Sequence, residues 1–442
     1  MKRSMSLGTP RSGRRSRALA AIVVGSLFFV ACGSDGGGST ETAAPSTEAP
    51  VEACLGGEDG PPTGPEMLIG MVNTEGNPNG LDFPDLRRFT EASFEYMNAC
   101  GGFGGRPVKL ETCVSGGTPE TSQACAQELV GKKVELILLG LDLFPDFATY
   151  EAAGLPVIGV LPILPPDFTA NALFLTGGNA TTTAVMAVIA QDRYQAKTVG
   201  IIHADNAGAN STAAGVEAAL DKAGIKWEAV KGGDNETDAG YLGLVQAANA
   251  NDPDILISLY ADAGCIGTIR GYKTAGITKP VLTTSICSDA DVISQVGDDA
   301  TGWVFVGGTI ERDTPEKALL QTILAPYVID EATGEMGIEP ADVNPAALGI
   351  DGLGSVLVLS LRNFAAEMVA GGTEMTGQNL YDFVKSADGL FLYGGITPVK
   401  CGLATPSYPS ICSYVFEATE YKDGAVVSVD DGKLWDSTPL LP

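Results

Sequence analysis

Short apolar runs rich in β-branched residues alternate with longer helical patterns along most of this chain. Such alternation is typical of βαβ units, in which helices connect parallel strands. One series opens with a strand at Met67 to Val72 and a helix at Pro84 to Ala99, and a second opens with a helix at Thr181 to Arg193. The sequence therefore predicts an α/β fold with mainly parallel sheets flanked by helices.

The length of the chain predicts two lobes. The roughly 375 residues of the folded part exceed what one hydrophobic core normally supports, and the two series supply one sheet each. Helices are expected near Pro315 to Val328 and Leu353 to Val369. The tail from Thr397 to Val429 is expected to form antiparallel strands, with Asp423 and Gly424 as a turn.

Residues 1 to 32 are typical of a secretory signal that is removed from the mature protein. Basic residues precede an apolar run from Ala18 to Val30, and Cys32 follows shortly after it. The run is shorter than the roughly 20 residues of a membrane-spanning helix, so a transmembrane anchor is the less favoured alternative. The segment's end resembles a bacterial lipobox, which implies that Cys32 carries a lipid. Arg14 and Arg15 form only a loose twin-arginine pair, so the export route stays open.

Residues 33 to 65 are rich in Gly, Ser, Thr, Glu, Pro and Ala. This composition has too little apolar surface to fold and predicts a flexible tether. With a lipid on Cys32, it predicts a domain held at the outer face of the cytoplasmic membrane.

Acidic residues outnumber basic ones, with 54 Asp and Glu against 27 Lys and Arg and a formal net charge of −27. Several of the basic residues lie in the signal segment, so the mature chain is more acidic still. This balance disfavours nucleic-acid binding. An evenly acidic surface usually serves solubility, so the charge identifies no ligand.

Eight cysteines remain once Cys32 is set aside, an even number in a chain marked for export, which predicts disulfides. A metal site is the less favoured alternative, because no CxxC pair occurs and His203 is the only histidine. Local spacing favours the pairs Cys113–Cys125, Cys265–Cys287 and Cys401–Cys412, which leaves Cys54 for Cys100.

Several strings between residues 66 and 310 carry a resemblance to a known family. They are MLIGMV (67–72), NACGGFGGRPVKLETC (98–113), GLPVIGV (154–160), LFLTGGN (173–179), KTVGIIHADNAGA (197–209), DPDILISLYADAG (252–264), YKTAGITKPVLTTS (272–285) and GWVFVGG (302–308). Their order and spacing resemble the type I periplasmic-binding fold. The most similar branch is the leucine/isoleucine/valine-binding group that serves ABC importers.

The resemblance implies that the chain crosses between its lobes three times. The crossings are expected near Thr176 to Gly178, Gly307 to Thr309 and Gly394 to Thr397. The first lobe would comprise residues 66–176 and 309–394, and the second residues 177–308 and 395–442. Glycines suit hinges because they accept backbone angles that other residues resist. The alternative is that they are ordinary loop glycines.

Ligands of parallel α/β sheets bind at the carboxyl ends of the strands, where helix N-termini expose backbone N–H groups. The site is therefore expected between two such edges, one on each lobe, with closure adding contacts. The candidate ligand-binding residues are Asn73, Asp142, Leu143, Phe144, Leu161, Pro162, Ile163, Asp205, Tyr260, Asp262 and Ser285.

The match to the family's amino-acid binders is poor at these loops. Those proteins hold the ligand's carboxylate with hydroxyl groups and backbone amides on two first-lobe loops. The corresponding loops here, Leu141 to Pro145 and Val160 to Pro165, contain no hydroxyl side chain. Ser285 stands where the resemblance places an acid for the ligand's ammonium, although Asp262 or Asp289 offers a substitute.

The apolar loops predict a ligand that is more apolar than a free amino acid. Its hydroxyl, amide or amine group would donate to Asp142, Asp205 or Asp262. The alternative is that the apolar side chains only pack the loops. Tyr260 stands where the family often places a binding-site aromatic, with packing between lobes as the alternative. Residues such as Asn73 and Asp205 are more often turn or helix-cap residues than ligand contacts.

Catalytic signatures such as GxxxxGK[ST], HExxH and GxSxG are absent from the sequence. The sequence therefore predicts no enzyme, no cofactor and no metal. The resemblance implies instead a receptor, expected to be monomeric, that delivers a small molecule to an ABC permease. A binder of branched-chain amino acids or amides and a ligand-sensing receptor for a signalling partner are the alternatives. A secreted hydrolase is the least favoured.

Overall fold

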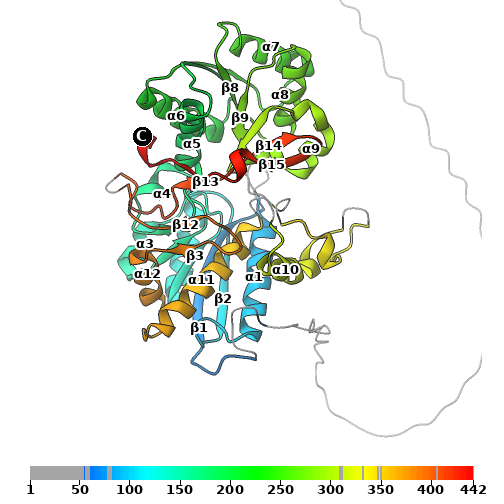
Figure 1. Ribbon diagram of the computed structural model, residues 1–442. Helices are drawn as coiled ribbons and strands as arrows, with labels where there is room; N and C mark the ends of the chain where they lie inside the picture. Colours follow the sequence, from blue (N-terminus) through cyan, green and yellow to red (C-terminus); the bar gives the residue numbers. More distant parts are fainter. Residues whose placement is uncertain are drawn as a thin grey trace, which may run out of the picture. The chain divides into compact units, whose positions relative to one another are not determined.

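The protein is described by a computed structural model (Figure 1). The described residues are 54, 60–76, 82–307, 312–330, 333–345, 348, 351–404 and 407–441. The predicted signal segment with Cys32, and Thr309 of the second expected crossing, lie outside these residues.

The first sheet is entirely parallel, as predicted. Its strands run in the order β2-β1-β3-β4-β5, and their apolar side chains alternate between two covered faces, as parallel sheets require. The strands are β1 (Met67–Thr74), β2 (Val108–Ser115), β3 (Leu136–Leu139), β4 (Val157–Gly159) and β5 (Leu173–Phe174).

Helices cover both faces of the first sheet. On one face, α1 (Pro84–Ala99), α11 (Leu353–Ala370) and α12 (Gly377–Ser386) bury apolar side chains against β1 and β3. On the other, α2 (Pro119–Lys132) and α3 (Phe147–Ala153) pack around Leu129 and Tyr150. Helix α11 is long and apolar enough to cross a membrane, but most of it is buried in this core.

The second sheet is mixed, in the order β15-β14-β10-β9-β8-β6-β7. Its parallel strands are β6 (Thr198–Ala204), β7 (Lys226–Gly232), β8 (Ile255–Leu259), β9 (Val281–Thr284) and β10 (Trp303–Val306). The antiparallel hairpin β14 (Ala418–Lys422) and β15 (Ala425–Ser428) completes it. Asp423 and Gly424 both have positive φ, as the predicted Asp-Gly turn requires.

The second sheet is also covered on both faces. One core cluster contains α5 (Gly178–Asp192) and α6 (Ala207–Ala223). The other contains α7 (Asp238–Ala248), α8 (Asp262–Thr274) and α9 (Ala290–Val296).

The structure differs from the expected elements in three places. The helix near Pro315 to Val328 is α10 (Pro315–Leu324), because Pro326 lies two residues beyond its end and cannot continue an α-helix. Helix α12 was not predicted. The tail is largely turns before Tyr414, so the expectation of antiparallel strands holds only for the β14–β15 hairpin and for short pairs.

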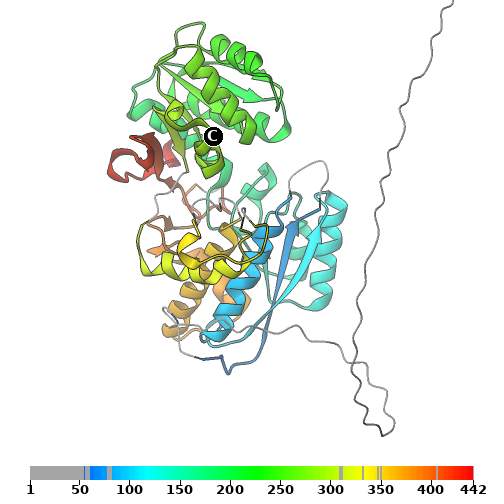
Figure 2. The ribbon, with the colours of Figure 1, turned by 90° about the vertical axis from the view of Figure 1, so that its right-hand side faces the viewer.

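The chain leaves the first core later than expected. Strand β12 (Pro398–Val399) pairs with β11 (Leu390–Phe391), and both Val399 and Cys412 lie in the core with α11, whereas Tyr414 lies in the second sheet's core. The expected third crossing at Gly394 to Thr397 is therefore wrong, and the crossing lies close to Cys412. In both views the orange α11 and α12 lie with the blue and cyan strands (Figures 1 and 2).

The structure contains the three disulfides that local spacing favours and the fourth pair that they leave. They are Cys54–Cys100, Cys113–Cys125, Cys265–Cys287 and Cys401–Cys412. Cys54–Cys100 corrects the extent of the tether, because it fastens a residue of that segment to the end of α1. The Gly64 N–H also donates to the Gly105 carbonyl at 3.0 Å. The described part of the predicted tether is thus attached to the folded domain.

Candidate functional site

Apolar side chains gather at the carboxyl edge of the first sheet, and we call this group the edge cluster. It consists of buried Met71, Leu86 and Leu141 with half-buried Phe83, Leu110, Leu161 and Ile163. The chain brings them together because the loops after parallel strands β1, β3 and β4 emerge at one edge. Leu161 and Ile163 were predicted here, and the structure adds Phe83, which directly precedes Pro84 of α1.

Asp142 lies at this edge but faces inward. It is 3 % exposed, and its Oδ1 accepts hydrogen bonds from the Ser122 hydroxyl at 2.5 Å and the Phe144 N–H at 3.3 Å. Burial raises the pKa of this carboxyl, and the hydrogen bond from Ser122 opposes that rise. Asp142 therefore holds its own loop in shape, which conflicts with its predicted role as an acceptor for the ligand.

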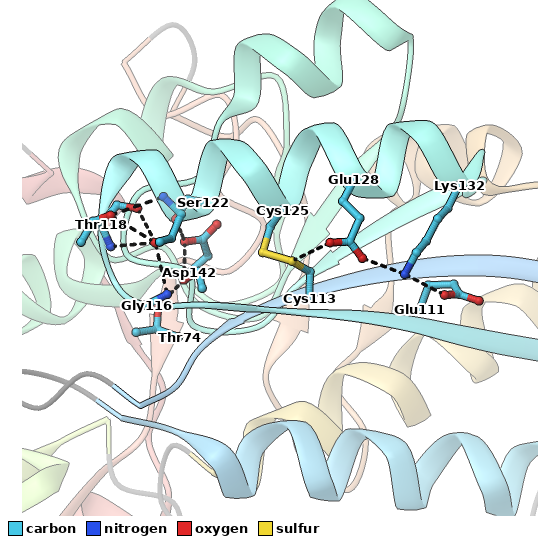
Figure 3. The surroundings of a disulfide bond; sticks show 12 residues. Thr74, Glu111, Cys113, Gly116, Thr118, Ser122, Cys125, Glu128, Lys132 and Asp142 are labelled. Atoms are coloured by element: carbon cyan, nitrogen blue, oxygen red, sulfur yellow. Dashed lines mark hydrogen bonds and ion pairs between the residues drawn. A yellow bond between two sulfur atoms is a disulfide. The ribbon is translucent and has the colours of Figure 1, made fainter.

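Figure 3 shows Ser122 and Asp142 meeting at the N-terminal turn of α2. Thr118 caps this helix by accepting from the Thr121 N–H, and Pro119 occupies its first turn. One turn beyond Ser122, the Cys113–Cys125 disulfide joins the same helix to β2. The cap before Ser122 and the disulfide after it therefore both hold the first turns of α2, and with them the donor to Asp142, in place.

Asn73 is also a scaffold residue. It is 1 % exposed, its Oδ1 accepts from the Leu141 N–H at 3.0 Å, and its Nδ2 donates to the Phe83 carbonyl at 2.7 Å. Its amide therefore joins the loops after β1 and β3. This agrees with the turn-residue alternative rather than with direct ligand contact.

Of the remaining predicted first-lobe residues, Phe144 is the most open. Its side chain is 39 % exposed, and Leu143 beside it is half-buried. Pro162, by contrast, is buried against Gly178, where a Cβ would lie 2.2 Å from the Pro162 carbonyl oxygen. The open apolar surface at this edge therefore comes from Phe144 and the half-buried members of the edge cluster.

A buried acid that was not predicted holds the loop after β4. Asp167, in the short helix α4 (Pro165–Thr169), is 2 % exposed and accepts from the N–H groups of Ile163 at 2.7 Å and Leu164 at 2.9 Å. Burial raises the pKa of Asp167 from its ordinary value of 3.8 to about 6. The sequence signal was available, since Asp167 is the third residue of a helix that opens with two prolines.

At the carboxyl edge of the second sheet, the predicted polar residues stand on separate loops. Asp205 is exposed and forms an ion pair with Lys231 at 3.0 Å, which lowers the pKa of its carboxyl. Asp262 is the first residue of α8. Ser285 begins a short 3-10 turn after β9 and is half-buried.

Tyr260 does not offer a stacking surface. It is 4 % exposed, and its ring packs edge-on against Tyr241, with centroids 5.6 Å apart, in the core under α7 and α8. The sequence placed it at a strand end, where either role was open. In the structure its ring packs as core, so the predicted ligand stacking is not supported.

The described residues contain no group of three or more His, Cys, Asp or Glu side chains placed to hold a metal ion. What the first edge offers is an apolar surface with a rigid, hydrogen-bonded frame. Such a surface can bind a small molecule through burial of apolar area.

Comparisons with known proteins agree with this arrangement. A family described as periplasmic binding protein matches residues 66–336. A comparison with curated proteins found no match. Solved structures share the fold, which confirms the predicted type I periplasmic-binding architecture.

Three of these structures illustrate the likeness. An ABC transporter substrate-binding protein from Sphaerobacter thermophilus has a TM-score of 0.64 and 18 % identity over 85 % of this chain and 99 % of its own. A leucine-binding protein from Thermotoga maritima has a TM-score of 0.56 and 13 % identity over 84 % of this chain and 98 % of its own. A solute-binding protein from R. palustris, in complex with benzoate, has a TM-score of 0.55 and 14 % identity over 84 % of this chain and 96 % of its own.

Proposed function

Because the chain belongs to the periplasmic binding protein family, and is therefore an exported protein, we propose that it serves an ABC importer. In this role it binds a small molecule and delivers it to the membrane permease. The proposal assigns it no catalytic step.

The edge cluster is the observation that carries the proposed ligand class. Phe83, Leu161 and Ile163 are half-buried at the carboxyl edge, and Phe144, on the loop after β3, is 39 % exposed. Burial of exposed apolar groups by a ligand lowers the free energy by about 25 cal/mol per Å² of apolar area removed from water. The two loops carry no side-chain hydroxyl, so a carboxylate would find only backbone N–H donors on the loops themselves. We infer a ligand with an apolar or aromatic body.

Two alternatives have specific support. The leucine-binding neighbour favours a branched-chain amino acid, and the benzoate complex of another favours an aromatic acid. A sensory receptor would use the same site and differ only in its partner. Genes for a permease and an ATPase beside this one would favour import.

A thermal-shift screen of the mature chain tests the ligand class. The protein is produced from residue 32 onward as Cys32→Ser and screened against amino acids, amides, benzoate and other aromatic or aliphatic acids. A ligand at 100 times its Kd stabilises the folded state by about 2.7 kcal/mol, which is measurable as a rise in Tm. The largest shift is expected from compounds with an apolar body and no α-amino acid group. The largest shift from leucine, isoleucine or valine would contradict that class, and no shift from any compound would contradict binding.

The lipid anchor is a separate part of the proposal. Cys32 follows the predicted signal at the position of a lipobox cysteine. Cells grown with radioactive palmitate should label the wild-type chain and leave Cys32→Ser unlabelled. Equal labelling of both would place the lipid elsewhere or exclude it.

A further inference from the structure

Asp167 stands between the edge cluster and residues 408–414, which include Cys412 and which we call the crossing segment. Its carboxylate points to one side and its backbone carbonyl to the other. The carboxylate Oδ2 accepts from the Ile163 and Leu164 N–H groups at 2.7 and 2.9 Å. The backbone carbonyl accepts from the Ser410 hydroxyl at 2.6 Å. One buried residue thus contacts both segments.

The segment that Ser410 belongs to is firmly attached to the end of the first sheet. The Phe174 N–H donates to the Ser410 carbonyl at 2.7 Å, and the Cys412 N–H donates to the Phe174 carbonyl at 2.9 Å. The Cys401–Cys412 disulfide is attached to the same segment. Beside Asp167, the rings of Phe168 and Tyr408 pack with centroids 5.7 Å apart.

We propose that Asp167 is a positioning residue that fixes the loop Leu161–Leu164 in its ligand-facing form and joins it to the crossing segment. The description of the loop as ligand-facing rests on the proposed function. The joining of loop and segment does not, because it follows from the hydrogen bonds alone. An acid serves here because one oxygen accepts from two successive backbone N–H groups, which an alanine cannot do.

The joint is expected to respond to pH. Burial raises the pKa of Asp167 to about 6, and the charged group in the described chain that acts on it is Asp142, on the loop after β3. When the loop opens, water reaches the carboxylate and its pKa falls towards 3.8. Opening therefore becomes easier as the pH rises through 6, and protonation keeps the joint closed.

Amide hydrogen exchange on the mature protein tests the joint without any ligand. Asp167→Ala should speed exchange at Ile163 and Leu164 by about tenfold or more, and exchange at Phe174 and Cys412 should rise with it. Asp167→Asn keeps a carbonyl acceptor and should restore most of the protection. In the wild type, opening at these amides should increase from pH 5 to pH 7.5 after correction for intrinsic rates, and in Asp167→Asn it should stay constant.

Asp254→Ala is the matched control. Asp254 also accepts from two successive backbone N–H groups, those of Lys197 at 2.7 Å and Thr198 at 2.9 Å, but beside the second sheet. Its loss should speed exchange only there. Faster exchange of Ile163 and Leu164 without Phe174 and Cys412 in Asp167→Ala would overturn the joint. Equally faster exchange of all amides, including those of β1, would mean that Asp167 only contributes to the global stability of the protein.

If Asp167→Ala does not fold, Ser410→Ala replaces it, because it removes only the hydroxyl that donates to the Asp167 carbonyl. Unchanged exchange at Ile163 and Leu164 in Ser410→Ala would overturn the joint. Equal pH dependence of loop opening in wild type and Asp167→Asn would overturn only its pH response. A failure of the ligand screen leaves these exchange results unaffected, so the two proposals can fail separately.

Discussion

The Ser122 hydroxyl donates to the Asp142 carboxylate at 2.5 Å, and both side chains are buried between α2 and the loop after β3 (Figure 3). Ser122→Ala removes this donor and leaves a buried carboxylate oxygen with weaker partners. We expect the free energy of unfolding in urea to fall by about 1–3 kcal/mol. Ser294→Ala, at an exposed position of α9, is the control and should change it by less than about 0.5 kcal/mol. Equal effects from both would mean that the bond contributes nothing.

This pair also shows what the sequence could and could not predict. The strands were predictable because Leu136 to Leu139 and Ile255 to Leu259 are short apolar runs between helical patterns, and both are buried on both faces. Asp142 was correctly placed at the end of a strand. Its orientation was not predictable, because the donor that holds it inward lies twenty residues earlier, in a different element.

Tyr260 and Asp167 show the same limit from opposite sides. A strand-end tyrosine looks like a ligand contact, yet the Tyr260 ring packs edge-on against Tyr241 in the space that Gly264 leaves by having no Cβ. The role of Asp167 was not predicted, because it depends on a contact with Ser410, which is distant in sequence. Side-chain direction in loops depends on such long-range packing, which periodicity does not encode.

Gly178 offers a test of the first crossing. Its φ is +53°, and a Cβ would lie 2.2 Å from the Pro162 carbonyl oxygen. Gly178→Ala must therefore push the start of α5 away from the loop after β4, and we expect a loss of about 1–3 kcal/mol in urea unfolding. Gly243→Ala in α7 meets no atom within 4 Å and should be neutral or stabilise by up to about 1 kcal/mol. A neutral Gly178→Ala would contradict the close approach.

The Cys401–Cys412 disulfide should contribute measurably to stability. It closes a loop with a sequence separation of 11, and replacing both cysteines by serine is expected to cost about 2–4 kcal/mol in guanidinium unfolding. Reduction of the wild type should lower its midpoint further, because three other disulfides also open. Cys113→Ser with Cys125→Ser, at a separation of 12, is the comparison and should cost a similar amount. If the first double variant matched the wild type, the disulfide would have no stabilising role.

Asp167 should make the stability of the protein depend on pH. Its folded pKa of about 6 lies above the ordinary 3.8, so its stabilising contribution is full below about pH 4 and is lost as the pH rises through 6. The difference in unfolding free energy between wild type and Asp167→Asn should therefore move against the wild type by up to about 3 kcal/mol from pH 4 to pH 7. Taking the difference removes the contribution of Asp351, whose pKa burial also raises to about 6. A constant difference across this range would show that Asp167 does not titrate there.

The edge cluster is tested by truncating its half-buried members one at a time. Phe83→Ala and Ile163→Ala remove apolar surface from the proposed ligand contact, and each is expected to weaken binding of the strongest compound in the screen. A loss of about 1.5–3 kcal/mol corresponds to a Kd about 10 to 100 times larger, measured by calorimetry. Phe391→Ala is the control, because Phe391 is 54 % exposed on β11 and not part of the cluster. Since Phe83 and Ile163 also pack the loops, their urea midpoints must be measured beside the affinities. Weaker binding with an unchanged fold in both variants would support contact, whereas unchanged affinity in both would place the ligand elsewhere.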